Sequence, residues 1–289
     1  PPMNPTASPV ALSFSTPRKG SLGTGGHRFD SGWLCKGCVD SYPILEYDPA
    51  PEAIIEPARV IRPRDIAEHC VLCFFRDVVD RVVATHNARL VADNRWEDGP
   101  HPLYEIWYNG RRLAFLHPGC GSSLAAALLE EVVAMGCRKF IACGGCGVLR
   151  RGVGLGEPIV VSSAVRDEGV SYHYLPPGRE VEAHPQAVEA LERVLRRRGI
   201  PYRVGKTWTT DPPYRETASK VARRRNEGCL VVEMEAAALM AVARFRGVVF
   251  GQALYAGDDL SGEEWDDRDW RSLRSVRELL YLVGRGGVP

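Results

Sequence analysis

The chain has 289 residues, of which 45% are hydrophobic and 25% charged, an ordinary composition for one large α/β domain or two small ones. The formal net charge is only +1 and no apolar run reaches the length of a membrane span, so we expect neither a nucleic-acid partner nor a membrane partner. Nine irregularly placed cysteines favour free thiols in a reducing compartment, and we therefore expect a cytoplasmic protein.

The first 63 residues differ in composition from the rest. Residues 1–40 are rich in Pro, Gly, Ser and Thr and predict an irregular extension. An organellar targeting role is compatible with their basic residues, but an unordered tail is the preferred interpretation. Residues 43–63 carry several prolines and alternating acids, which predicts an extended arm over the domain surface. We therefore divide the chain into an extension and arm, 1–63, and a domain, 64–289.

From residue 64 onward, apolar runs alternate with helical patterns, which predicts a single α/β domain with a central mixed sheet flanked by helices. The runs expected to form strands are 70–75, 113–116, 140–143, 159–161, 202–204, 230–232 and 248–255. The segments expected to form helices are 122–135, 185–198 and 216–226, and each is followed closely by a glycine.

Three C-x-x-C pairs occur along the chain. They are Cys35/Cys38, Cys70/Cys73 and Cys143/Cys146. Two such pairs could bind zinc if they folded together. However, residues 69–75 read as a strand, which would point alternate thiols to opposite faces or bury both. We predict no metal site, and Cys35/Cys38 would be the first contributor if one existed.

Two glycine-rich segments follow predicted strands and are candidates for ligand contact. In the first, Gly121, Ser122 and Ser123 stand at the start of a predicted helix, where free backbone amides attract anions. In the second, Gly144 and Gly145 follow the run 140–143 and allow close approach of the backbone. The alternative for both segments is a tight turn packed against the sheet.

The most informative feature is a pair of acids within an apolar run, where Glu233, Met234 and Glu235 separate a strand-like half from an alanine-rich helical half. Carboxylates are rarely buried without a partner or a ligand. In open α/β sheets, the end of a strand before a helix is also where ligands bind. We therefore predict a binding site at this strand-to-helix junction.

Two more segments carry candidate chemistry. Asp258 stands at the end of the run 248–255 and is either a general acid or a helix cap. Residues 207–217 carry a Pro-Pro break that makes polar and aromatic side chains available to a pocket rim, where a flat heterocycle could bind. These side chains include Thr209, Thr210, Tyr214 and Arg215.

Taken in this order, residues 66–270 resemble the nucleoside phosphorylase superfamily, which comprises uridine and purine nucleoside phosphorylases and related nucleosidases. The most specific part is Glu233-Met234-Glu235 followed by Asp258. The resemblance implies one α/β domain, often in dimers or trimers of dimers, that acts on a nucleoside and phosphate without a cofactor. It also implies that Glu235 grips the ribose hydroxyls and that Met234 packs against the sugar, with Glu233 on the ribose side or in a structural role. Asp258 would protonate a purine base.

The same resemblance places Thr209, Thr210, Tyr214 and Arg215 around the base and both glycine segments on the phosphate side. There the sequence departs from the pattern. The family's Gly-Asp-Pro-x-Arg loop is replaced by a segment containing Arg76 and Asp77, and an expected arginine and a Thr or Ser are replaced by Ala142 and Gly145. Loss of such contacts would cost charge-assisted bonds to a phosphate dianion.

Two explanations of this departure remain open. Either Arg76 or Arg81 supplies the positive charge from a new position, or the enzyme uses water, with Asp77 as a candidate base. A non-catalytic nucleoside-binding protein is a third alternative. The expected function is cleavage of a nucleoside's N-glycosidic bond, purine favoured, by a pentosyltransferase of purine salvage that yields free base and pentose 1-phosphate. Because the reaction has a cation-like transition state, it needs an anchored sugar and a stabilised leaving base.

Overall fold

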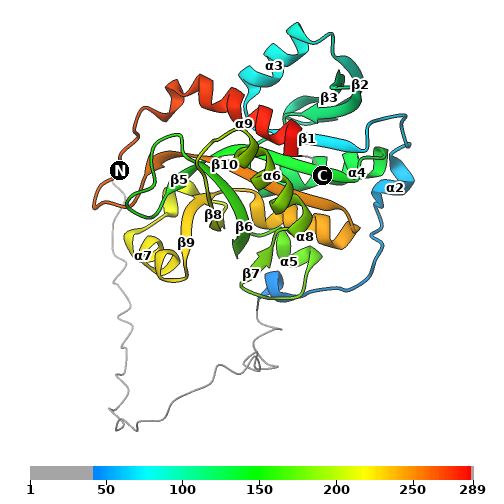
Figure 1. Cartoon of the computed structure of the whole chain (residues 1–289). Coiled ribbons are helices and arrows are strands. Elements are labelled where there is room, and N and C mark those ends of the chain that lie inside the picture. Colours follow the sequence, from blue (N-terminus) through cyan, green and yellow to red (C-terminus); the bar gives the residue numbers. More distant parts are fainter. Residues whose placement is uncertain (1–41, 288–289) are drawn as a thin grey trace, which may run out of the picture.

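A computed structural model describes residues 42–287 of the chain (Figure 1). The predicted extension over residues 1–40 and the Cys35/Cys38 pair lie outside the described residues. The predicted arm consists mostly of irregular chain with two short helical turns, η1 (Pro43–Leu45) and α2 (Pro57–Val60). Arg246 donates to Glu56 at 2.9 Å and so ties this arm to the domain.

The strands form one ten-stranded mixed sheet, which confirms the predicted fold class. Its order is β10-β6-β8-β9-β5-β1-β4-β3-β2, and β7 pairs with β6. β10 also pairs with β5, so β5, β10, β6, β8 and β9 form a closed circuit. The strand bounds are β1 His69–Cys73, β2 Arg89–Trp96, β3 Gly99–Tyr108, β4 Arg111–Leu116, β5 Lys139–Val148, β6 Pro158–Asp167, β7 Glu180–Glu182, β8 Arg203–Thr210, β9 Cys229–Glu233 and β10 Val249–Asp259.

Helices cover both faces of the sheet. The remaining helical elements are α3 Arg76–Thr85, α4 Ser122–Met135, α5 Ser171–Tyr174, α6 Pro185–Arg197, η2 Pro213–Arg215, α7 Ala218–Asn226, α8 Ala236–Arg246, η3 Trp270–Ser272 and α9 Arg274–Gly287. One core cluster joins the sheet to α4 and α8, and the other joins it to α3, α6 and α9. Side chains of β1 point alternately to the two faces of the sheet, so that Cys70 packs in the first cluster and Cys73 in the second. Both thiols are fully buried, as the strand interpretation predicted.

Local signals located the helices well. α4 spans the predicted 122–135 and ends at Gly136, whose φ of 134° is accessible to glycine. α6 ends one residue before the prediction. α7 begins at Ala218 rather than residue 216, because the Thr217 side chain caps the helix by accepting from the Lys220 amide.

The structure corrects the second glycine segment. β5 runs from Lys139 to Val148, so Gly144 and Gly145 lie within a strand and not in a turn after it. They pair there with Leu254 and Tyr255 of β10. A Cβ on Gly145 would lie 3.1 Å from the Tyr255 ring, closer than ordinary packing allows. The glycine therefore permits close approach of two strands, which overrides its low strand propensity.

Candidate active site

The predicted acids lie where β9 and β10 end beside the N-terminus of α4. β5 runs between these two strands, antiparallel to β9 and parallel to β10. Burial raises the pKa of Cys146 on β5, and the charges of Glu233 and Asp258 raise it further. The carboxyl groups of two distant segments therefore act on one point of the sheet, as expected for a site at strand ends.

Glu233 supports the start of α8. Its Oε2 accepts from the amides of Glu235 at 2.7 Å and Ala236 at 2.6 Å, and its Oε1 accepts from Thr209 Oγ1 at 2.6 Å. The Thr209 hydroxyl in turn accepts from the Ala237 amide at 3.0 Å. Free amides at a helix start need such acceptors. Glu233, predicted on the ribose side, thus has both oxygens occupied by protein donors.

We expect Glu233→Ala to lower the free energy of unfolding by about 2–4 kcal/mol, because it leaves two buried amides and the Thr209 hydroxyl without their acceptor. Urea unfolding monitored by circular dichroism measures this change. The matched control is Glu131→Ala, where the lost bond joins the carboxyl to Trp96 at the surface, and its cost should stay below about 1 kcal/mol. Equal costs for the two variants would contradict the supporting role of Glu233.

Glu235 is buried with only 8% exposure at the N-cap of α8. Its Oε1 accepts from the Gly121 amide at 2.5 Å, a contact between segments 114 positions apart. Burial raises its pKa to about 8, and the neighbouring Glu233 carboxyl adds to the shift. Hydroxyl groups of a ligand that donate to this carboxyl would favour its ionised form, which burial disfavours.

The loop before α4 is joined to the same acids. Ser122 Oγ donates to the Met234 carbonyl at 2.6 Å, so this hydroxyl positions the β9–α8 turn. Gly121 adopts a φ of 88°, which glycine favours, and its amide is committed to Glu235. The amides of Ser122 and Ser123 lie in the first turn of α4, where the helix supplies no backbone acceptor. They remain suited to an anion, and Ser123 is exposed.

The two basic candidates of α3 have different surroundings. Arg81 pairs with Glu278 of α9. Arg76 is exposed at the start of α3, and no ion pair or hydrogen bond of its guanidinium occurs within residues 42–287. Its charge acts on His117 and on Cys120 of the loop before α4. Among the described residues, Arg76 is therefore a cation without a protein partner whose charge reaches the loop before α4.

Asp77, the candidate base for water, is half-exposed and lies 3.7 Å from Arg277 Nη1 of α9. Ala142 is fully buried within β5 and Gly145 is exposed on the same strand. Neither carries a polar side chain toward an anion. Among the residues predicted on the phosphate or water side, the groups that remain available to an anion are the amides of Ser122 and Ser123 and the guanidinium of Arg76.

Asp258 lies near the end of β10, within the strand rather than in the loop after it. Its Oδ2 accepts from Trp265 Nε1 at 2.7 Å. A Cβ on Gly147 would lie 3.5 Å from the same oxygen, so this glycine leaves space beside the carboxylate. Glu216 is close enough for Asp258 to influence its titration: burial raises the Glu216 pKa to about 7, and the Asp258 charge raises it further.

The predicted base-side residues are less uniform. Thr209 and Thr210 are buried on β8, and the Thr209 hydroxyl is committed to Glu233 and Ala237. Tyr214 is 98% exposed beside exposed Arg215 in η2. Their contact with a base stays a prediction.

Sequence reasoning missed Glu216 and His117. Glu216 looked like the first residue of a helix, and only folding brings it near Asp258. His117 lies directly after β4 and shortly before the first glycine segment. Its Nδ1 accepts a hydrogen bond from the Gly119 amide at 3.1 Å. Burial, with a contribution from the Arg76 charge, lowers its pKa to about 4. Its position directly after a predicted strand was the available signal.

Within the described part of the chain, no group of three or more His, Cys, Asp or Glu side chains could hold a metal ion. Over the same residues, no helix is long and apolar enough to cross a membrane.

Comparisons with known proteins identify the family of the chain. The model of the phosphorylase superfamily matches residues 69–282. A guanosine phosphorylase of Halorubrum lacusprofundi is 28% identical over 239 residues, covering 79% of this chain and 96% of the relative. A uridine phosphorylase of Thermococcus kodakarensis is 29% identical over 158 residues, covering 53% of this chain and 54% of the relative.

Solved structures show the same fold. A uridine phosphorylase from Vibrio fischeri superposes with a TM-score of 0.69 at 22% identity, over 81% of this chain and 96% of that one. An AMP nucleosidase from Bacteroides thetaiotaomicron gives 0.63 at 20% identity, over 77% and 87%.

The fold is that of an α/β protein with a mixed sheet, and the carboxyl groups at the ends of β9 and β10 mark its candidate ligand site. The chain belongs to the phosphorylase superfamily, which confirms the resemblance noted from its motifs.

Proposed function

We propose that this protein cleaves the N-glycosidic bond of a nucleoside, with a purine favoured, by phosphorolysis to free base and pentose 1-phosphate. The observation that carries the proposal is Glu235, a buried carboxyl held by the Gly121 amide at the start of α4, with Asp258 near the end of β10, which is separated from β9 by β5. One carboxyl serves the sugar and the other the base. An oligomeric assembly is part of the proposal.

The division of labour follows from the chemistry of the bond. As it breaks, positive charge develops on the sugar and negative charge on the leaving base. Glu235, once ionised, accepts from ribose hydroxyls and fixes the sugar. Asp258, with Glu216 beside it, offers a proton or a hydrogen bond to the base. The amides of Ser122 and Ser123, together with Arg76, would hold the attacking phosphate.

Hydrolysis is the second candidate function, and a specific observation favours it. The strand β5 presents Ala142 and Gly145 where the family's phosphate-binding side chains are expected, so fewer donors face an anion. Asp77 would then act on water, although its carboxylate already lies 3.7 Å from Arg277. Substitution of Arg76 distinguishes phosphorolysis from hydrolysis, because its guanidinium has no protein partner among the described residues and is available to a phosphate.

We expect nucleoside cleavage to require phosphate and to yield pentose 1-phosphate. The measurement is product analysis of guanosine, inosine and uridine incubations, with phosphate and in phosphate-free buffer. Arg76→Gln should raise the KM for phosphate by about tenfold, because it removes a charge-assisted contact. Arg81→Gln is the matched control. Free ribose released at the same rate without phosphate would replace phosphorolysis by hydrolysis, and binding without cleavage would leave a nucleoside-binding protein.

A further inference from the structure

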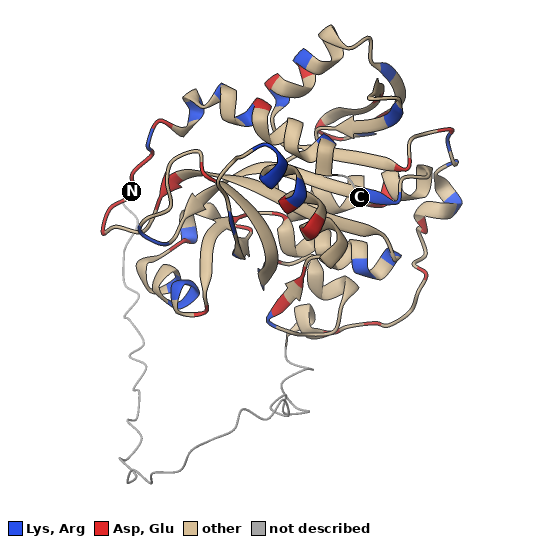
Figure 2. Ribbon diagram, viewed as in Figure 1, with Lys and Arg blue, Asp and Glu red and all other residues tan. Residues whose placement is uncertain are grey.

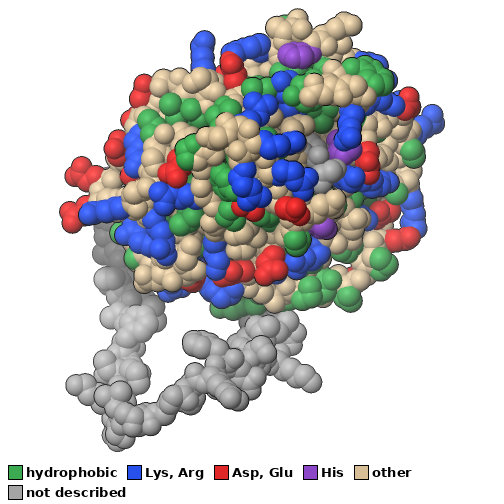
Figure 3. Space-filling view, viewed as in Figure 1, with side chains coloured by type: hydrophobic (Ala, Val, Ile, Leu, Met, Phe, Trp, Pro, Cys, Tyr) green, Lys and Arg blue, Asp and Glu red, His purple; other side chains and the backbone are tan. Residues whose placement is uncertain are grey.

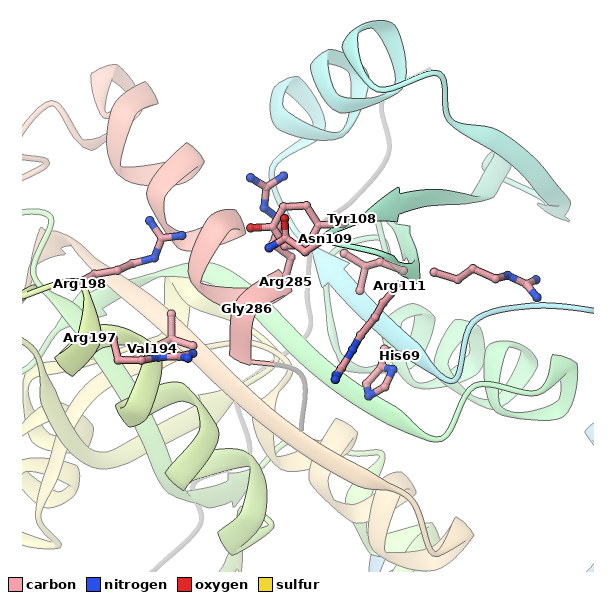
Figure 4. A pocket seen from close by; sticks show the side chains of 11 residues that line it. His69, Tyr108, Asn109, Arg111, Val194, Arg197, Arg198, Arg285 and Gly286 are labelled. Carbon is pink, nitrogen blue, oxygen red and sulfur yellow. The ribbon is translucent and has the colours of Figure 1, made fainter.

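A cavity lies at the opposite end of the central strands from the candidate active site. Its volume is about 450 Å³, within the range of small-molecule sites. His69, the first residue of β1, lines it, whereas the candidate active site lies at the carboxyl ends of β9 and β10. Loop Tyr108–Arg111, the end of α6 and the end of α9 enclose it (Figure 4).

The cavity is lined by basic side chains from three separate elements. Arg197 and Arg198 lie on one side, Arg111 on the opposite side and Arg285 between them (Figure 4). Neither Asp nor Glu is among the described residues that line it. Arg112 also reaches the cavity, but its charge is balanced by Asp65 at 2.6 Å and by Glu105.

The other four guanidiniums have no such balance. Within the described residues, no ion pair or hydrogen bond is made by the guanidinium group of Arg111, Arg197, Arg198 or Arg285. Arg285 instead lies over the Tyr108 ring, with its guanidinium carbon 4.0 Å from the ring centre. Its Nε is buried without an acceptor, and such a donor is costly to leave unsatisfied. A bound acceptor at this place would remove that cost.

Other arginines of α6 do have acidic partners. Arg193 and Arg196 face solvent and pair with Glu189 and Glu192, one turn earlier. Figure 2 shows acidic residues in the first part of the helix and arginines at its end, and Figure 3 shows Lys and Arg side chains gathered over this region. Cations at a helix C-terminus are favoured by the helix dipole. That preference does not explain why unpaired arginines of β4 and α9 converge on the same cavity.

We propose that this cavity binds an oligophosphate, either inorganic or the phosphate chain of a nucleoside triphosphate, at a site separate from the candidate active site. A single phosphate carries about two negative charges, half of what four guanidiniums can neutralise. Two or more linked phosphates match the charge, and guanidiniums bind their oxygens in bidentate geometry. Because a half-open cavity of about 450 Å³ and not an extended surface stripe carries the charge, the ligand is small.

The test is isothermal titration calorimetry of the full chain with inorganic tripolyphosphate. The double variant Arg197→Gln/Arg198→Gln should weaken binding by about tenfold or more. The matched control is Arg193→Gln/Arg196→Gln, which removes the same charge from the same helix and should stay within about twofold of wild type. All four side chains are exposed, so both variants should fold.

Additional arms separate the alternatives. Arg76→Gln should leave tripolyphosphate affinity unchanged, and loss of binding in this variant would move the ligand to the candidate active site and overturn the proposal. Equal weakening of tripolyphosphate binding by the two double variants would show that binding depends only on net positive charge, and it would overturn the proposed site. Inorganic phosphate that binds as tightly as tripolyphosphate and is weakened equally by Arg197→Gln/Arg198→Gln would also overturn it. Similar affinity for adenosine triphosphate and tripolyphosphate supports recognition of the phosphate chain, and tighter nucleotide binding supports a site that also contacts the nucleoside.

Discussion

Glu235→Gln should reduce the turnover of any nucleoside that this protein cleaves by about 10²–10³-fold. Glutamine keeps an oxygen that can accept from the Gly121 amide, so the N-terminus of α4 stays in place. It loses the negative charge that grips the ribose hydroxyls and that compensates the positive charge developing on the sugar. Steady-state kinetics should show the loss mainly in kcat/KM.

The same substitution should stabilise the protein at neutral and alkaline pH. The Glu235 pKa lies at about 8 in the folded chain, against an ordinary value of 4.5. A carboxyl with a raised pKa contributes stability below its unfolded pKa, and that contribution is lost as the pH rises through the folded value. The advantage of Glu235→Gln in unfolding free energy should therefore grow between pH 4.5 and pH 8, by about 1 kcal/mol per pH unit.

Urea unfolding of both proteins over this pH range, together with turnover, tests the two effects in one variant. Glu131→Gln is the matched control, because this half-buried carboxyl of α4 accepts from Trp96 and lies outside the site. Its turnover should match wild type. A Glu235→Gln variant that cleaves nucleosides at nearly the normal rate would remove Glu235 from the mechanism and, with it, the proposed function.

The opposite behaviour of Glu233 and Glu235 shows what the sequence could and could not predict. Both acids stood out because they interrupt an apolar run, and the structure places them at the strand-to-helix junction that this pattern predicted, with Glu233 at the end of β9 and Glu235 at the N-cap of α8. Their partners come from β8 and from the loop before α4, 24 and 114 positions away. No local pattern reports which acid meets a helix amide, so the supporting role of Glu233 required the fold.

The same distinction explains the other differences. α4 was predictable because its start and end depend on neighbouring residues, as the Gly136 conformation shows. The strand through Gly144 and Gly145 was not, because pairing with β10 decides it. Glu216 escaped notice because its raised pKa depends on burial and on Asp258, which lies on another element.

Asp258→Asn should lower the cleavage of purine nucleosides by about 10²–10⁴-fold, the range expected when a general acid is removed. Asparagine fits the same space beside Gly147, and its oxygen can still accept from Trp265. The variant should therefore fold normally. The loss should fall on the step in which the base leaves, because a purine anion is a poor leaving group without a proton or a strong hydrogen bond.

The choice of substrate separates this role from a structural one. The nitrophenolate of a nitrophenyl riboside leaves readily as an anion without being protonated. Asp258→Asn should therefore cleave this substrate at close to the wild-type rate while its cleavage of purine nucleosides is lost. Glu263→Gln is the matched control, because this exposed acid lies in the loop that follows β10. Equal losses on both substrates would assign Asp258 to positioning. If purine activity remaining in the variant disappears on adding Glu216→Gln, the proton belongs to the pair, as the Glu216 pKa near 7 predicts.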